Sequence, residues 1–176
     1  TSLGEMIPCG GINEQDAAIG TGSTVYNEND KLYYTFFTGH KYELNEGDSR
    51  EMVMMATSPD FKTWTKSRTF YLRGADYGYE KNDFRDPFVF RGDDNLYHML
   101  VSAKKGGKGV LAEWTSTDMK EWNHKGVFMT YMWDRFYECP DVFKMGDWWY
   151  LVYSEQHNAI RRVQYFKGRT LDELKA

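Results

Sequence analysis

Three segments of this chain repeat one pattern, and this repetition limits the possible fold more than any other feature. Residues 24–33, 88–97 and 141–150 align without gaps. Each reads as a short strand, a turn built from Gly, Asp or Asn, and a second strand rich in aromatic residues. The second copy begins 64 residues after the first, and the third begins 53 residues after the second. The sequence therefore predicts consecutive units of antiparallel strands.

The second half of the unit is repeated as well. An apolar strand, a Ser-x-Asp turn and a tryptophan follow one another over 52–64, and the same order returns over 110–122. Ser and Asp side chains close such turns through hydrogen bonds to the backbone. We expect Trp64 and Trp122 to pack back on their sheets. A third copy of this half begins with a strand at 161–166.

Four strands per unit, at a spacing of 53 to 64 residues, are typical of β-propeller blades. A closed ring needs at least about four blades, whereas 176 residues supply about three at this spacing. We therefore predict an all-β partial propeller: one domain over 1–176, with blades near 20–80, 84–135 and 137–176. A β-sandwich whose strands resemble one another by accident is the alternative.

Composition excludes several classes of protein. The net charge of −4 lacks the basic excess of a nucleic-acid binder, and no apolar run approaches the ~20 residues that span a membrane. The four histidines and two cysteines share no ligand spacing, so we expect neither a metal nor another cofactor. The sequence does not decide whether Cys9 and Cys139 form a disulfide. The chain does not open with a signal peptide, which slightly favours the cytoplasm without deciding the compartment.

The repeat also predicts where chemistry could occur. The innermost strand of each blade lines the central channel, so the residues just before each first strand should meet at one mouth. This register brings Asp86 and Glu138 to that mouth, among aromatic neighbours. Burial there should raise carboxyl pKa values toward the range of a general acid, while Arg85 should hold Asp86 ionised and oriented. Two such carboxylates are typical of a glycosidase, although Asp and Glu also cap strands and pair with Arg in propeller rims.

The motifs at these positions carry a resemblance to a known family. Arg85-Asp86-Pro87, with Glu138-Cys139 following 52 residues after Asp86, resembles the paired motifs of glycoside hydrolase family 32. That family contains invertases, sucrose-6-phosphate hydrolases, levanases and inulinases. Residues 20–23 are similar to its Ser-Gly-Ser segment, and residues 37–40 to its Tyr-Thr-Gly stretch. Related five-bladed families that act on arabinosides share Arg-Asp-Pro and form a further alternative, which Glu138-Cys139 disfavours.

The resemblance implies a five-bladed propeller that hydrolyses β-fructofuranosides, such as sucrose or fructans, with retention through a covalent fructosyl-enzyme. Glu138 is then the general acid/base. Asp86, helped by Arg85, binds hydroxyls of the fructosyl ring and stabilises an oxocarbenium-like transition state. The partner implied is a fructose-containing saccharide. Further candidates for substrate binding at the same mouth are Thr21, Ser23 and Trp133.

One part of the family pattern is missing. The nucleophile of family 32 is the Asp of a Trp-Met-Asn-Asp-Pro-Asn-Gly motif, and no Asn-Asp-Pro occurs in these 176 residues. We therefore expect no hydrolysis by this chain alone. Either it is part of a longer enzyme, or a second polypeptide or self-association completes the ring. A non-catalytic carbohydrate-binding propeller, or a truncated relic of one, is the alternative function.

Overall fold

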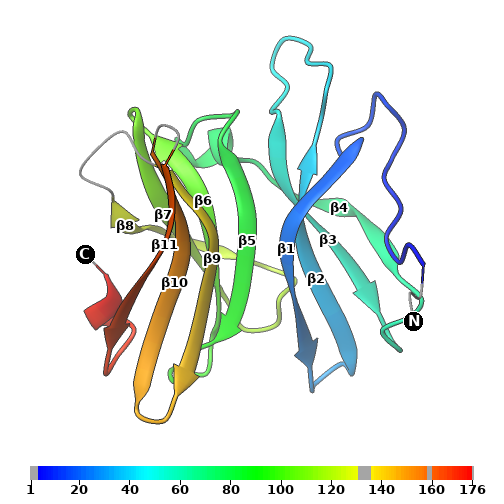
Figure 1. Ribbon diagram of the computed structural model, residues 1–176. Coiled ribbons are helices and arrows are strands. Elements are labelled where there is room, and N and C mark those ends of the chain that lie inside the picture. The colour runs from blue at the N-terminus through cyan, green and yellow to red at the C-terminus, as the bar shows by residue number, and fades with distance from the viewer. Residues whose placement is uncertain (1–3, 131–135, 158–159, 176) are drawn as a thin grey trace.

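The computed structural model describes residues 4–130, 136–157 and 160–175, and Figure 1 shows their arrangement. Within these residues, eleven strands form three sheets, and two short 3₁₀ turns follow β4 and β11. The first sheet contains β1 (Ala18–Asn27), β2 (Leu32–His40), β3 (Glu51–Ser58) and β4 (Thr65–Leu72). The second contains β5 (Phe84–Arg91), β6 (Tyr97–Lys105), β7 (Lys108–Ser116) and β8 (Asn123–Thr130). The third contains β9 (Phe136–Met145), β10 (Trp148–His157) and β11 (Ile160–Gly168), and the 3₁₀ turns are η1 (Gly74–Tyr77) and η2 (Asp172–Leu174).

Each sheet is an antiparallel meander in which neighbours in sequence are neighbours in space. The repeated Ser-x-Asp turns form as predicted. The Asp60 carboxylate accepts the backbone N–H groups of Lys62 and Thr63 at 2.8 and 2.7 Å, and Asp118 does the same in the second sheet. Trp122 packs edge-on against Phe36 with ring centroids 5.4 Å apart, so this tryptophan joins the second sheet to the first.

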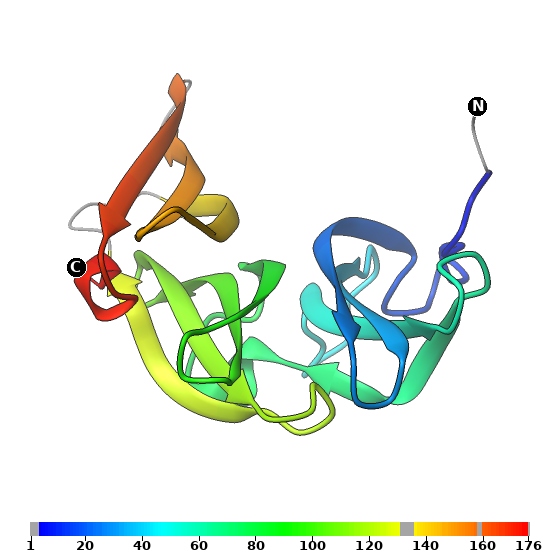
Figure 2. The same cartoon turned by 90° about the horizontal axis from the view of Figure 1, so that it is seen from below.

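The three sheets follow one another around an open arc, which Figure 2 shows from below. Their first strands form the inner side of this stack, because β1 packs against β5 and β5 packs against β9. The all-β partial propeller is therefore confirmed. The β-sandwich alternative is wrong, since three sheets are stacked in sequence instead of two facing each other.

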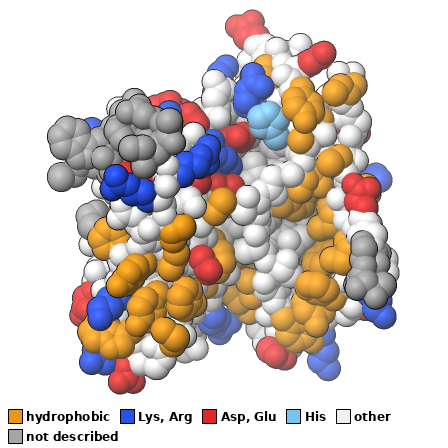
Figure 3. Space-filling model, in the orientation of Figure 1, with side chains coloured by type: hydrophobic (Ala, Val, Ile, Leu, Met, Phe, Trp, Pro, Cys, Tyr) orange, Lys and Arg blue, Asp and Glu red, His pale blue; other side chains and the backbone are white. Residues whose placement is uncertain are grey.

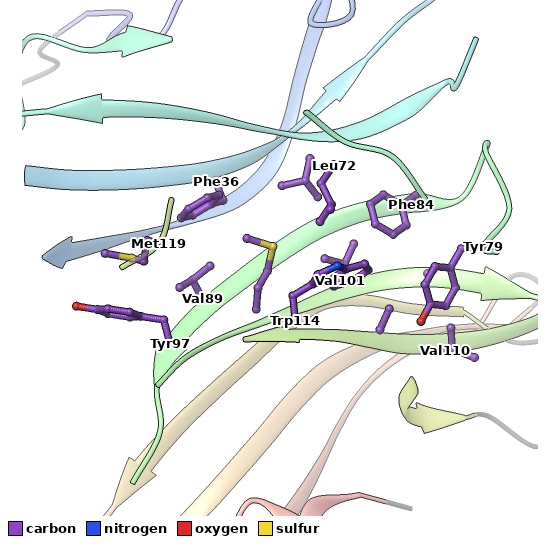
Figure 4. Close-up of a cluster of buried hydrophobic side chains, with 14 of the residues drawn as sticks. Phe36, Leu72, Tyr79, Phe84, Val89, Tyr97, Val101, Val110, Trp114 and Met119 are labelled. Carbon is purple, nitrogen blue, oxygen red and sulfur yellow. The ribbon is translucent and has the colours of Figure 1, made fainter. Parts of the chain in front are cut away.

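Apolar side chains fill the spaces between the sheets. The larger cluster lies between the first two sheets and includes Phe36, Phe84 and Trp114, none of them exposed (Figure 4). A second cluster lies between the second and third sheets around Leu100 and Leu151. The middle sheet is thus covered on both faces, which explains why β6 is buried from Tyr97 to Ala103 and lacks the alternation of a half-exposed strand. In the described part of the chain, no helix is long and apolar enough to cross a membrane.

Candidate active site

A cavity of about 320 Å³ opens at the inner edge of the three sheets. Its walls come from six strands, namely β1, β2, β3, β5, β9 and β11. Its polar lining includes Thr21, Thr38, Glu51, Arg85, Asp86 and Glu138. Four of these six residues, all but Thr38 and Glu51, are candidates from the sequence, and Thr38 belongs to the motif at 37–40. The predicted mouth therefore exists and contains both predicted carboxylates.

Each inner strand departs from regular pairing beside this cavity. The register shifts lie between Ile19 and Gly22 in β1, between Arg85 and Phe88 in β5, and between Glu138 and Asp141 in β9. Asp86 and Cys139 have positive φ angles of 57° and 50°, a backbone conformation that residues other than Gly rarely adopt. Such bulges turn side chains out of the regular alternation. Here they direct the carboxylates of two neighbouring strands into one space.

Asp86 is buried and held from two directions. Its Oδ2 accepts the backbone N–H of Cys139 at 3.0 Å, and its own N–H donates to Thr38 Oγ1 at 2.9 Å. Burial raises the pKa of the Asp86 carboxyl above its usual value, while the Cys139 hydrogen bond and the charge of Arg85 oppose this rise. The expected upward shift of this pKa is therefore confirmed.

Arg85 does not orient Asp86 as predicted. Its charge favours the ionised form of Asp86, but its hydrogen bonds among the described residues go to Glu51, Asp83 and Glu138. The expected partner was wrong because three other carboxylates, those of Glu51, Asp83 and Glu138, take up the terminal nitrogens of the Arg85 guanidinium. The backbone of β9, at Cys139, orients Asp86 instead.

Glu138 is held between two arginines. Arg85 Nη2 donates to its Oε1 at 3.2 Å, and Arg161 Nη1 donates to its Oε2 at 2.8 Å. The two arginines differ in freedom. The Arg161 side chain is 64% exposed, whereas that of Arg85 is 19% exposed and its guanidinium stacks 4.1 Å above the ring of Phe136. A ligand can therefore displace Arg161 from Glu138 more readily than Arg85.

The sequence did not single out Glu51, which is part of the cavity wall. This buried carboxylate begins β3, and its Oε2 accepts the N–H of Phe84 at 3.1 Å and Nη1 of Arg85 at 3.0 Å. His40 Nδ1 lies 3.6 Å from its other oxygen. The only available signal was an acidic residue directly before the apolar run 52–56.

The remaining predicted residues fall in different places. Thr21 lines the cavity, where its carbonyl accepts the Thr38 hydroxyl at 3.0 Å. Ser23 lies two residues further along β1 and connects two sheets, because its hydroxyl donates to Pro87 O at 3.1 Å and accepts Val89 N–H at 2.8 Å. Trp133 lies outside the described residues. Cys9 and Cys139 are both free thiols.

Residues 10–175 match the model of the Glycosyl hydrolases family 32 N-terminal domain. A sucrose-6-phosphate hydrolase of Escherichia coli is 28% identical over 156 residues, which are 84% of this chain and 30% of that protein. One from Vibrio alginolyticus is 41% identical over 129 residues, which are 69% of this chain and 24% of that protein.

Among solved structures, a sucrose-6-phosphate hydrolase from Lactobacillus gasseri superimposes with a TM-score of 0.73 at 21% identity. The superposition covers 92% of this chain and 35% of that structure. At this identity it shows the shared fold. The chain thus spans about a third or less of the length of the proteins that it matches.

Proposed function

Because the chain belongs to glycosyl hydrolase family 32, we propose that it carries two of the carboxylates with which a β-fructofuranosidase hydrolyses sucrose or fructans. Glu138 is the general acid/base, and Asp86 binds fructosyl hydroxyls and stabilises the oxocarbenium-like transition state. The observation that carries this proposal is the shared cavity. Bulges of two neighbouring inner strands direct Asp86 and Glu138 into it.

The surroundings of Asp86 suit the role that we give it. A group that stabilises a developing positive charge must keep its position while the bond breaks, since preorganised groups cost no reorganisation at that moment. The hydrogen bonds to Cys139 N–H and Thr38 Oγ1 hold the side chain and the backbone of Asp86. Thr21 at the cavity wall is a further candidate for contacts with a sugar hydroxyl.

The surroundings of Glu138 suit proton transfer once a substrate is present. Both of its oxygens are hydrogen-bonded to arginine, so the leaving oxygen of a fructoside must displace one arginine to reach it. We assign this displacement to the exposed Arg161, while Arg85 stays in place beneath the substrate. Trp133, which we predict from its place in the sequence to lie at the pocket rim, stays a candidate for stacking on the sugar.

The nucleophile must come from outside these residues, because the 176 residues contain no Asn-Asp-Pro. We propose that it is supplied by a longer chain, by a second polypeptide or by self-association. Hydrophobic side chains are exposed on the third sheet, among them Val163 and Tyr165, which are 75% and 66% exposed, and Figure 3 shows such side chains over β9–β11. Exposed apolar patches of this kind mark surfaces that a partner covers.

Two assays test the proposal. The chain alone should release no glucose or fructose from sucrose. Co-expression with the N-terminal part of a family 32 enzyme, which supplies the Asn-Asp-Pro motif, should restore release, and Glu138→Gln should abolish it. Asp147→Asn is the matched control, since that side chain is 88% exposed and outside the cavity wall. Turnover by the chain alone, or restored turnover that survives Glu138→Gln, contradicts the proposal.

The alternative, a carbohydrate-binding propeller without catalysis, is favoured by the absence of Asn-Asp-Pro from this sequence. It predicts that fructose or inulin shifts the amide NMR signals of Asp86 and Cys139, while the combined polypeptides still fail to hydrolyse sucrose. Restored hydrolysis that depends on Glu138 excludes this alternative.

A further inference from the structure

Glu51 is a buried carboxylate to which the proposed catalytic roles assign no task. It is 8% exposed and lies opposite His40 in the β2–β3 hairpin, at the head of a strand whose other buried residues are mostly apolar. Replacing a buried ion pair by apolar side chains of similar volume is often neutral or stabilising. Stability alone therefore does not explain why a carboxylate occupies this position.

The carboxylate of Glu51 reaches across to β5 on the next sheet. Its Oε2 accepts two hydrogen bonds there, one from the backbone N–H of Phe84 at 3.1 Å and one from Arg85 Nη1 at 3.0 Å. One oxygen thus fixes both the backbone just before Arg85 and the guanidinium of Arg85. The contact with Glu51 uses Nη1 of Arg85, whereas the contact with Glu138 uses Nη2.

The guanidinium of Arg85 divides its nitrogens between two tasks. Nη1 donates to Glu51 and to Asp83, the latter at 3.1 Å, whereas Nη2 donates to Glu138 Oε1 at 3.2 Å. The ring of Phe136, 4.1 Å from the guanidinium carbon, fixes the plane of the group. Because a guanidinium is a rigid planar fork, an anchored Nη1 in a fixed plane decides where Nη2 points.

We propose that Glu51 is a positioning residue that holds the guanidinium of Arg85 so that its other end meets Glu138. The inference rests on the proposed function, because a catalytic Glu138 gives this arrangement its chemical use. Asp83 binds the same nitrogen but is less suited to the task. Its side chain is 26% exposed, against 10% for Glu51, and it also pairs with Lys104 at 3.4 Å.

Three variants separate these roles: Glu51→Gln, Glu51→Asp and, as the matched control, Asp83→Asn. The measurement is the NMR signature of the Arg85 guanidinium, whose Nη signals are distinct when rotation of the group is restricted. We expect both Glu51 variants to broaden or merge these signals. Gln removes the charge, and Asp keeps the charge but is shorter by one carbon–carbon bond, ~1.5 Å. Asp83→Asn should leave the signals as they are.

A second measurement reports charge instead of position. Burial raises the pKa of Asp86, and the like charges of Glu138 and Glu51 add to this rise, while the Cys139 N–H and Arg85 oppose it. Glu51→Gln should therefore shift the NMR titration of the Asp86 carboxyl to lower pH, whereas Glu51→Asp should shift it less. This titration follows the charge of Glu51, whereas the Arg85 signals follow its position, so a change in the Arg85 signals of Glu51→Asp reports position without loss of charge.

Arg85 Nη signals that stay distinct in folded Glu51 variants overturn the proposal. Broadening of these signals in Asp83→Asn to the same extent as in the Glu51 variants overturns it too. Glu51→Asp retains the negative charge and carries the test if Glu51→Gln does not fold. Neither readout needs turnover. If fructose shifts no amide signal of Asp86 or Cys139, that result counts against the proposed function. The Arg85 signals of the Glu51 variants are measured without fructose, so they test the positioning role separately.

Discussion

The hydroxyl of Thr38 connects the first sheet to the residue that we propose stabilises the transition state. Thr38 is 3% exposed. Its Oγ1 donates to Thr21 O at 3.0 Å and accepts the N–H of Asp86 at 2.9 Å. Thr38→Val keeps the branched shape and the strand preference of the side chain and replaces the hydroxyl by a methyl group. The variant therefore measures what this one bridge contributes.

The expected magnitude follows from the surroundings of the two hydrogen bonds. Asp86 is 6% exposed, so its N–H loses its partner without access to water, which costs ~1–3 kcal/mol. Loss of the bond to Thr21 costs about 1 kcal/mol at most, because Thr21 is exposed and water can replace the hydroxyl. Burying one more methyl group offsets about 0.8 kcal/mol. The net loss is about 2 kcal/mol, or ~4–8 °C in Tm for a chain of this size.

Urea unfolding followed by tryptophan fluorescence measures this loss, and hydrogen exchange at the Asp86 amide reports the bridge directly. Thr24→Val is the matched control on the same hairpin. The Thr24 hydroxyl donates to Thr35 Oγ1 at 3.0 Å, but Thr24 is exposed, so we expect a change below ~0.5 kcal/mol. A Thr38 variant that loses no more than this control, with the Asp86 amide still protected, refutes the reasoning.

Two further predictions concern charge and assembly. Burial raises the pKa of Asp86 in the folded chain, so its ionised form lowers stability above the unfolded pKa of about 3.9, and this effect disappears as the pH falls below that value. Urea titrations should therefore show Asp86→Asn more stable than the parent near pH 7 but not near pH 3, and an equal difference at both pH values contradicts this. Because Met145, Val163 and Tyr165 on the third sheet are 61%, 75% and 66% exposed, size-exclusion chromatography should show species larger than 20.7 kDa, whereas a stable monomer contradicts this expectation.

The sheets could be predicted from the sequence because their determinants are local. A Ser-x-Asp turn such as that at Asp60 is closed by side chains two or three residues away, and a hairpin such as β1–β2 pairs residues that are close in sequence. Three copies of one local pattern then predict three similar sheets. The same register placed Asp86 and Glu138 at one cavity, because equivalent positions in successive blades lie at the same end of the channel.

The contacts within the site could not be predicted in this way, because they join strands of different sheets. The hydrogen bonds from Arg85 to Glu51 and from Cys139 N–H to Asp86 span 34 and 53 residues of sequence. The bulges could in principle have been predicted from the sequence. Both non-Gly residues with positive φ in the site, Asp86 and Cys139, precede a proline, and proline within a sheet is typical of bulges. The direction in which a bulge turns its side chain depends on the neighbouring sheet.

A chain of polar contacts crosses all three sheets at the inner edge, from Thr21 through Thr38 and Asp86 to Cys139. Its members should therefore not act independently. Without the Thr38 hydroxyl, the backbone at Asp86 can relax and expose the carboxylate to water, so the stability gained by Asp86→Asn near pH 7 should become smaller. Residues that share a network typically show coupling of about 0.5–3 kcal/mol in a double-mutant cycle. Additivity of Thr38→Val and Asp86→Asn to within about 0.5 kcal/mol would show instead that each sheet holds its own part of the site.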